Sequence, residues 1–311
     1  MTYRNLSNIF KTILAVAFLA ILPGMGMAQT LSNNYSDIKP GSILFFNRFT
    51  SNPINPLLGD TQINITNLNQ NKSIALHFYM VDGSSCSVAD SGQSLAPSQT
   101  MSYLMSDYDP GIFGYLIVVA QDLETGLPTQ HNWLAGTALV REFDGRQAVL
   151  SAISIGKLSI GNITADPDGL YRLKFNGATY EKLPQTLAVT SFDSQVSTTS
   201  FMYIYSPSSN IYIGEANTAS ISTLLFNDSS QSLSGSFSLT CYRQDSFMTF
   251  FSRGGGINRH VPAGRSGWIR LHSSSAPILG SVISRNSMFQ GGYNLTAIAL
   301  YGNHEIIVPN F

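Results

Sequence analysis

The sequence is short of charged residues. Only 11% of its 311 residues are Asp, Glu, Lys or Arg, whereas an average soluble domain carries roughly 25%. Helices on a protein surface need Glu, Lys and Arg on their wet face, so this scarcity disfavours long exposed helices. Sheets need fewer charges, because Thr, Ser and Tyr suit their outer faces. Aromatic residues reach 11%, which argues against a disordered chain.

Long apolar runs are also lacking, since no stretch beyond the N-terminal region reaches 18 apolar residues. We therefore expect no transmembrane segment in the mature chain. The N-terminus has the pattern of a secretory signal peptide, with basic Arg4 and Lys11, an apolar run at residues 12–22 and small residues at 26–28. This pattern predicts cleavage after residue 28 and a secreted protein, whether periplasmic, on the cell surface or extracellular. An uncleaved N-terminal anchor is the alternative.

The chain has little net charge of either sign. Loss of residues 1–28 would leave 15 basic and 18 acidic residues, a net charge of −3. Nucleic-acid-binding domains are usually strongly basic, so we expect no nucleic-acid partner.

Cysteine is scarce, with Cys86 in the first half and Cys241 in the second. An exported chain usually oxidises a compatible pair, so a disulfide between the two is one prediction, and it would join the two halves. The alternative is an isolated thiol in a loop at 86 and a small buried apolar side chain at 241.

The sequence does contain an internal repeat with two copies, as its length of 311 residues also suggests. The two copies align residues 40–51 with 184–194, residues 62–67 with 222–227, and residues 95–114 with 261–280. The aligned segments alternate apolar and polar residues, and clusters of Gly, Pro, Asn, Asp and Ser separate them. This pattern is typical of short antiparallel strands in a β-sandwich.

We therefore predict an all-β protein with two domains. A first β-sandwich domain would cover residues 29–150 after the signal peptide at 1–28, and a second at 184–311 would repeat it. Residues 151–183 would connect the two. The pattern of the apolar segment that leads into this connector, near 147–158, fits either a short helix or a strand.

Four short motifs stand out in the first half: Cys86-Ser-Val-Ala-Asp90, Ser106-Asp-Tyr-Asp-Pro-Gly111, Gly114-Tyr-Leu-Ile-Val-Val-Ala120 and His131-Asn-Trp-Leu-Ala-Gly136. They resemble a group of uncharacterised secreted bacterial proteins, mainly over residues 40–140. Members of that group often have a second Cys soon after the first, where this chain has Ser91-Gly92-Gln93. The topology also resembles immunoglobulin-like modules of bacterial surface proteins. The resemblance implies export and two tandem immunoglobulin-like antiparallel β-sandwich domains, and it brings no activity and no catalytic residues.

No catalytic motif stands out. The nucleophile elbow Gly-x-Ser-x-Gly is missed by one position at residues 264–268, where glycines closing a turn are the simpler interpretation. His304-Glu305 begins like a metalloprotease helix, but no second His stands four residues on, and the segment reads as a terminal strand. We expect no catalytic residues.

Metal-binding patterns are equally weak. His260 and His272, twelve residues apart, are the one pair of histidines that we considered as ligands. Two pairs of aspartates, Asp107/Asp109 and Asp166/Asp168, fit a calcium loop less well than ordinary turns, because Asp bonds its own backbone in turns. We expect no metal site and no cofactor.

Positive charge gathers in one segment of the second half. Between Tyr242 and Arg285 the chain has six arginines and one acid, a net of +5, whereas residues 29–183 carry a net charge of −4. The planar fork of Arg suits carboxylate, sulfate or phosphate, and sugars stack on aromatic faces. One hypothesis is a site for anionic glycans built from Arg243, Arg253, Arg259, Arg265, Trp268 and Arg270, with Tyr242, Phe247 and Phe250 as further aromatic groups. In the alternative, the arginines scatter over both faces of a sandwich or meet the acidic first domain of a neighbouring molecule.

The function these patterns favour is that of an exported non-enzymatic surface or matrix protein, a structural or adhesion module. Its partner would be an extracellular polysaccharide or a surface protein. Two alternatives stay open. One is a carbohydrate-active hydrolase on a β scaffold, which would need convergent acidic groups. The other is a subunit of a strand-exchanging extracellular assembly, through an exposed edge strand such as His304–Pro309.

Overall fold

The computed structural model describes residues 37, 39–52, 54–55, 57–194, 198–251 and 256–309. Within these ranges the protein is all-β, and every pairing between named strands is antiparallel, which confirms the predicted class. The predicted signal peptide lies outside the described residues. Three helical pieces of one turn complete the described part: η1 (Met105–Asp107), α2 (Phe247–Phe250) and α3 (Ile257–His260). None of these turns has the length or apolar character that a membrane crossing requires.

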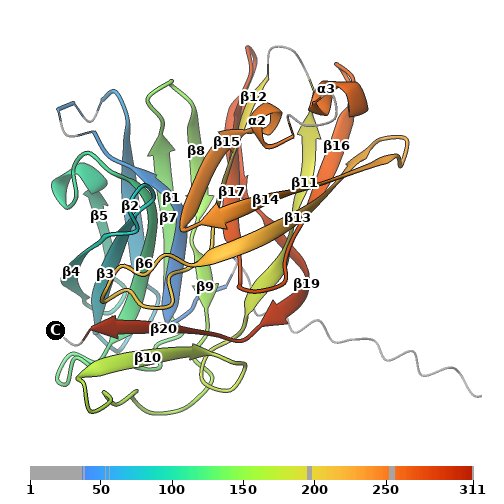
Figure 1. Ribbon diagram of the computed structural model, residues 1–311. Helices are drawn as coiled ribbons and strands as arrows, with labels where there is room; N and C mark the ends of the chain where they lie inside the picture. Colours follow the sequence, from blue (N-terminus) through green and yellow to red (C-terminus); the bar gives the residue numbers. More distant parts are fainter. Residues whose placement is uncertain are drawn as a thin grey trace, which may run out of the picture. The chain divides into compact units, whose positions relative to one another are not determined.

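The first half of the chain forms two sheets (Figure 1). Its strands are β1 (Ile43–Thr50), β2 (Asp60–Asn67), β3 (Ile74–Asp82), β4 (Val88–Leu95), β5 (Thr100–Leu104), β6 (Phe113–Gln121), β7 (Leu134–Arg141), β8 (Gln147–Ser151), β9 (Ile153–Ile155) and β10 (Leu170–Phe175). Sheet I has the order β4-β3-β6-β1-β9, and sheet II has the order β5-β2-β7-β8.

The second half repeats this arrangement strand for strand. Its strands are β11 (Leu183–Asp193), β12 (Thr199–Tyr205), β13 (Thr218–Asn227), β14 (Ser232–Thr240), β15 (Tyr242–Ser246), β16 (Ser266–Ser273), β17 (Leu279–Arg285), β18 (Gln290–Asn294), β19 (Thr296–Gly302) and β20 (His304–Pro309). Sheet III has the order β14-β13-β16-β11-β19, and sheet IV has the order β15-β12-β17-β18. Each strand of the second half therefore corresponds to the strand of the first half whose number is lower by ten.

Local irregularities repeat as well. The register of β1 against β6 shifts between Phe46 and Phe49, and that of β11 against β16 shifts between Val189 and Phe192. A glycine stands beside each bulge, Gly114 in β6 and Gly267 in β16. A Cβ atom on either glycine would collide with a carbonyl oxygen of the next strand. The two copies thus share a backbone constraint that demands glycine.

This strand order corrects the alignment made from the sequence. Residues 62–67 form β2, whose counterpart is β12, whereas the sequence alignment matches them to residues 222–227 in β13. The alignment of residues 95–114 with 261–280 likewise matches β5 to β16, although the counterpart of β5 is β15. The physical reason is that every half-buried strand shows the same apolar alternation, so the pattern does not reveal which strand it belongs to.

The connector contains strands and no helix among its described residues. Residues 147–151 alternate exposed and buried side chains as β8, and Ile153–Ile155 is fully buried as β9 at the edge of sheet I. The short helix is therefore wrong and the strand alternative holds. A helix here would leave one edge of β1 unpaired and would remove Ile153 and Ile155 from the core. The pairing of β9 with β1 therefore overrides the ambiguous local pattern.

The two halves meet in a buried interface, and all the described residues belong to one compact unit. β10 from the first half pairs with β20 from the second, as Figure 1 shows. The rings of Tyr115 and Tyr205 stack with centroids 4.0 Å apart, and the Tyr205 hydroxyl donates to the Asn47 side-chain oxygen at 2.9 Å. Aromatic stacking and buried hydrogen bonds thus join the halves.

Candidate functional site

The outer face of sheet III carries two of the predicted site residues. In β16 the residues Gly267, Ile269 and Leu271 are buried. Because successive side chains of a strand point to opposite faces, Trp268 and Arg270 lie together on the outward face. The sequence alternation alone could have predicted this pairing.

Trp268 stacks on an aromatic neighbour that the sequence analysis missed. Its ring lies 4.5 Å from the ring of Phe226 with an interplanar angle of 9°. The two residues are directly opposite each other in the β13–β16 pairing. Trp268 remains 36% exposed, so part of its indole is open to solvent. The signal that could have found Phe226 is its place in the outward series of β13, but only the strand pairing brings it to Trp268.

Arg270 is the cation of this face. It stands opposite Leu224 on β13 and Ala188 on β11, so no acidic residue faces it across either pairing. No described residue forms an ion pair with it. We call the outward surface formed by Ser222, Leu224, Phe226, Trp268, Arg270 and His272 the sheet III face. It combines an aromatic plane, an unneutralised guanidinium and hydroxyl groups.

Two further predicted arginines stand at one end of the sheet III face. Arg265 precedes β16 and forms an ion pair of 3.0 Å with Asp228, while its side chain stays 58% exposed. Arg259 is an exposed residue of α3. The Asn227 amide donates to the His260 carbonyl at 3.0 Å, which fixes α3 at this same end. Arg265 is therefore partly neutralised, and Arg259 lies beside the face without being part of it.

Arg243 lies elsewhere, and this separates the predicted cluster. It belongs to β15 of sheet IV and forms an ion pair of 3.0 Å with Asp245. Its guanidinium covers the rings of Phe237 and Phe250 at 4.9 and 4.6 Å. Arg253 lies outside the described residues. The structure thus joins Trp268 and Arg270 on one face and leaves Arg243 on another sheet.

The other aromatic groups that we considered are not available as sugar platforms. Tyr242 and Phe247 are buried, and Phe250 is covered by Arg243. Tyr242 lies against the ring of Tyr115 in the interface between the halves. Their aromatic surface stabilises the core instead.

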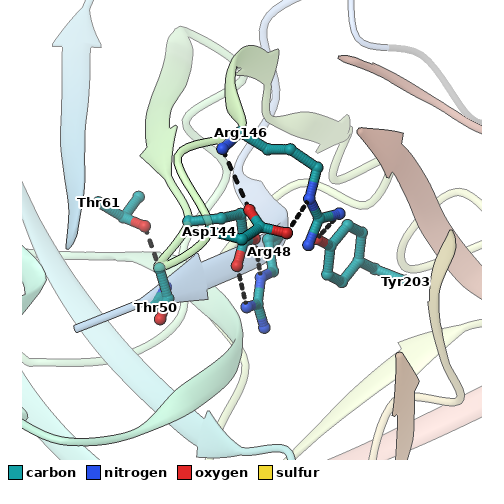
Figure 2. A network of polar contacts seen from close by, with 7 residues as sticks. Arg48, Thr50, Thr61, Asp144, Arg146 and Tyr203 are labelled. Atoms are coloured by element: carbon teal, nitrogen blue, oxygen red, sulfur yellow. Dashed lines mark hydrogen bonds and ion pairs between the residues drawn. The ribbon is translucent and has the colours of Figure 1, made fainter. Parts of the chain in front are cut away.

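A buried polar network is the second chemical feature of the molecule, and the sequence analysis missed it (Figure 2). Arg48 donates two hydrogen bonds of 2.7 Å to the carboxylate oxygens of Glu142. Its guanidinium lies 4.6 Å from the ring of Tyr203 in the second half. The Tyr203 hydroxyl accepts a hydrogen bond of 2.9 Å from Arg146, which also pairs with Asp144 at 2.7 Å. No sequence signal links Arg48 and Glu142, because 94 residues separate them.

This network crosses from the first half to the second, because Tyr203 contacts both Arg48 and Arg146. The bidentate contact with Arg48 occupies both carboxylate oxygens of Glu142. Burial raises the pKa of Tyr203 well above its ordinary value, which keeps its hydroxyl neutral. The ion pair between Arg48 and Glu142 is thus buried, and the ring of Tyr203 lies over the guanidinium.

Two adjoining hollows open at one end of the second half. One, of about 330 Å³, is lined by Asp193, Arg285, Phe289, Tyr293 and smaller residues. The other, of about 360 Å³, shares Asp193 and Ser200 with it. Burial raises the pKa of Tyr293 to about 12, so its hydroxyl is neutral at physiological pH. Asp193 is the sole acid among the lining residues of either hollow.

Two of the residues considered as metal ligands, His272 and Asp166, have other partners. The His272 ring nitrogen Nδ1 lies 2.9 Å from the Thr186 hydroxyl. Asp166 accepts the backbone N–H groups of Leu170 and Asp168, which lowers its pKa and marks a turn. Across the described ranges no group of three or more His, Cys, Asp or Glu side chains gathers as metal ligands would.

Cys86 and Cys241 form a disulfide bond with an S–S distance of 2.14 Å. Cys86 lies in the turn between β3 and β4, and Cys241 lies between β14 and β15. Both have positive φ angles, 62° and 61°. The bond joins the two halves of the chain across 155 residues of sequence.

Comparison with known proteins identifies no family. No protein-family model and no curated protein matches the chain. Among solved structures it is similar to the PBSX exported protein XepA, with 7% identity, a TM-score of 0.21 and coverage of 84% of each chain. It is also similar to a glycosyl hydrolase family 2 member from Bacteroides cellulosilyticus, with 7% identity and a TM-score of 0.16 over 87% of this chain and 29% of that one. A Bacteroides uniformis beta-glucuronidase is similar with 11% identity and a TM-score of 0.16, over 85% of this chain and 27% of that one.

The chain therefore spans less than a third of the length of these two glycosidases. TM-scores this low support no argument about function.

Proposed function

We propose that the protein is an exported, non-enzymatic surface or matrix protein that binds anionic glycans through the sheet III face. In this proposal each half is an immunoglobulin-like β-sandwich. The first half and the buried interface act as a rigid support. The observation that carries the proposal is the stacked pair of Trp268 and Phe226 beside Arg270, which has no ion-pair partner among the described residues.

The chemistry of this face matches an acidic sugar. The apolar C–H groups of a pyranose ring pack on an aromatic plane, and the exposed side of Trp268 supplies one. The fork of Arg270 matches the geometry of a carboxylate or sulfate group. Ser222 and the outward serines of β14 provide hydroxyls for the sugar's own hydroxyl groups. A flat sheet suits an extended chain of sugars better than a single small molecule.

A hydrolase is less well supported. Glycoside hydrolysis uses two carboxyl groups on either side of the scissile bond. The two hollows of the second half contain Asp193 as their sole acid, and Glu142 is neutralised by Arg48. We therefore favour binding over hydrolysis.

The proposal is tested by measuring binding of the purified protein to heparin, polygalacturonate and neutral dextran. We expect the two anionic polymers to bind and dextran not to bind. Trp268→Ala and Arg270→Gln should each weaken binding about fivefold or more, because stacking and a charged hydrogen bond each contribute roughly 1–3 kcal/mol.

Matched controls come from the first half. Trp133 is 50% exposed against 36% for Trp268, so Trp133→Ala removes an indole that is at least as accessible. Arg141→Gln removes an exposed arginine that bonds the Leu57 carbonyl. Both variants should bind as the parent does. The proposal fails if no anionic polymer binds, or if the Trp268 and Arg270 variants bind as well as the controls.

Export has its own test. Secretion by a bacterial host followed by N-terminal sequencing should give a mature protein that begins at residue 29. Retention of residues 1–28 on the secreted protein would contradict the signal-peptide prediction and favour an anchor.

A further inference from the structure

The edge of β14 is unusual among the sheet edges of this protein. β14 is the end strand of sheet III and pairs with β13 along all nine of its residues. Its sequence, Ser-Leu-Ser-Gly-Ser-Phe-Ser-Leu-Thr, contains no charge and no proline. Natural proteins usually protect such an edge with charges, proline, bulges or short strands, because an unprotected edge accepts another strand.

The other edges described are protected in one of these ways or are covered by another strand. β4 carries Asp90, and β15 carries Arg243 and Asp245. β5 has five residues and β9 three. β8 and β18 meet each other, with the Asn294 amide donating to the Ser151 carbonyl at 2.7 Å. β19 is uncharged but shorter, and its register against β11 shifts between Thr186 and Leu187. β20, the edge expected from the sequence, already pairs with β10 along six residues.

The backbone of β14 shows which groups are free. The hydrogen bonds from Cys241 N to the Asn217 carbonyl and from Asn227 N to the Gln231 carbonyl close the hairpin at both ends. Odd-numbered residues of this segment therefore bond to β13, since hydrogen-bonded pairs alternate in an antiparallel ladder. The N–H and C=O groups of the even-numbered residues, Ser232 to Thr240, point away from the sheet.

The sequence of β14 is nearly symmetric about Ser236. In an antiparallel pair of two β14 strands with Ser236 facing Ser236, Leu233 faces Leu239 and Gly235 faces Phe237. This register places even residues opposite even residues, so it uses the free backbone groups. An aromatic ring opposite a glycine is a favourable cross-strand pair. The inward residues Leu233 and Phe237 are only half-buried in one chain, and the second strand would cover them.

We propose that β14 is a homodimerisation edge, pairing antiparallel with β14 of a second copy of this chain around a two-fold axis at Ser236. The two five-stranded sheets then form one continuous sheet of ten strands, with an isologous interface. The surface serines make this contact polar on its outer face, and no like charges oppose each other along it. The two sheet III faces lie on the same side of the joined sheet.

The first test is the oligomeric state in solution. Sedimentation equilibrium of the purified protein should show a reversible monomer–dimer equilibrium. Ser236→Lys should shift it to monomer, because two lysines would face each other at the axis. The side chain of Ser236 is exposed, so the variant should fold. Ser220→Lys is the matched control, an exposed serine on the same face one strand inward, and it should remain dimeric.

Cross-linking tests the register. Residues in a hydrogen-bonded antiparallel pair have Cα atoms about 5.5 Å apart, within disulfide reach. Ser236→Cys should therefore give a covalent dimer on a non-reducing gel. Ser238→Cys should not, because the two copies of position 238 would lie about 13 Å apart along the strands. A mixture of Ser234→Cys and Ser238→Cys should cross-link, since these positions face each other.

Three results would contradict the dimer. A monomer at all accessible concentrations would overturn the proposal. So would a dimer that Ser236→Lys leaves intact, or equal cross-linking of Ser236→Cys and Ser238→Cys. None of these results depends on glycan binding, which is measured separately on the Trp268 and Arg270 variants.

Discussion

Arg48 and Glu142 meet through two parallel hydrogen bonds of 2.7 Å at a place from which water is excluded, with side chains 3% and 5% exposed. Arg48 comes from β1 and Glu142 from the turn after β7, while the ring of Tyr203 from the second half covers the guanidinium. The pair therefore links both sheets of the first half to the second half.

We expect Glu142→Gln to lower the free energy of unfolding by about 3–5 kcal/mol, because it leaves the Arg48 charge buried without a counter-charge. Arg172→Gln is the control, since Arg172 is 41% exposed and its ion pairs with Asp166 and Glu305 lie at the surface. That change should reduce stability by less than about 1 kcal/mol. Urea denaturation followed by tryptophan fluorescence measures both, and similar losses for the two variants would contradict the assigned role.

Replacement of both cysteines, Cys86→Ala with Cys241→Ala, should lower stability by roughly 2–5 kcal/mol. The bond closes a segment of 155 residues, and its removal frees the unfolded chain of that constraint. The denaturation midpoint of the parent should fall to a similar extent in a reducing buffer, while that of the double variant should not respond. A parent protein indifferent to reductant under denaturing conditions would argue against the bond.

Stability should fall as the pH is lowered from about 6.5 to 4. Burial lowers the pKa of His131 to about 4, whereas an exposed histidine titrates near 6.5. The unfolded chain then takes up a proton in this window that the folded chain does not, so the folded state loses on the order of 3 kcal/mol at most. Above this window the neutral ring is stable in both states and the full contribution is present.

The pH profile can be assigned with one substitution. In the folded chain His131 Nε2 lies 2.8 Å from the Asn67 side-chain oxygen, and the amide of His131→Gln can donate to the same oxygen. This variant should show a flatter dependence of melting temperature on pH. Part of the slope should persist, because burial also lowers the pKa of His304 to about 4. An unchanged slope would show that His131 does not titrate in this way.

The glycine beside the β1–β6 bulge offers a packing test. A Cβ atom on Gly114 would collide with the Val81 carbonyl, so Gly114→Ala should destabilise the protein by about 1–3 kcal/mol through forced backbone movement. Gly92 in β4 is the control, because the nearest atom to an added Cβ is 3.8 Å away. Thermal melting of the two variants should differ clearly, and equal melting temperatures would contradict the close approach seen here.

The sequence determined the class of this fold because its signals are local. Few charges and a two-residue apolar period favour half-buried strands, and strand alternation alone places Trp268 and Arg270 on one side of β16. The scarcity of cysteine made the pair Cys86 and Cys241 the one available disulfide.

The tertiary structure decided which strands pair, and with them the composition of every site. The partner of Trp268 is Phe226 because β13 pairs with β16. The partner of Arg48 is Glu142 because β1 of sheet I packs against β7 of sheet II. The arginines that are near in sequence separate onto two sheets, since Arg243 and Arg270 belong to strands of different sheets. Similar strands have similar local patterns, so only the packing of the whole core selects one register over the others.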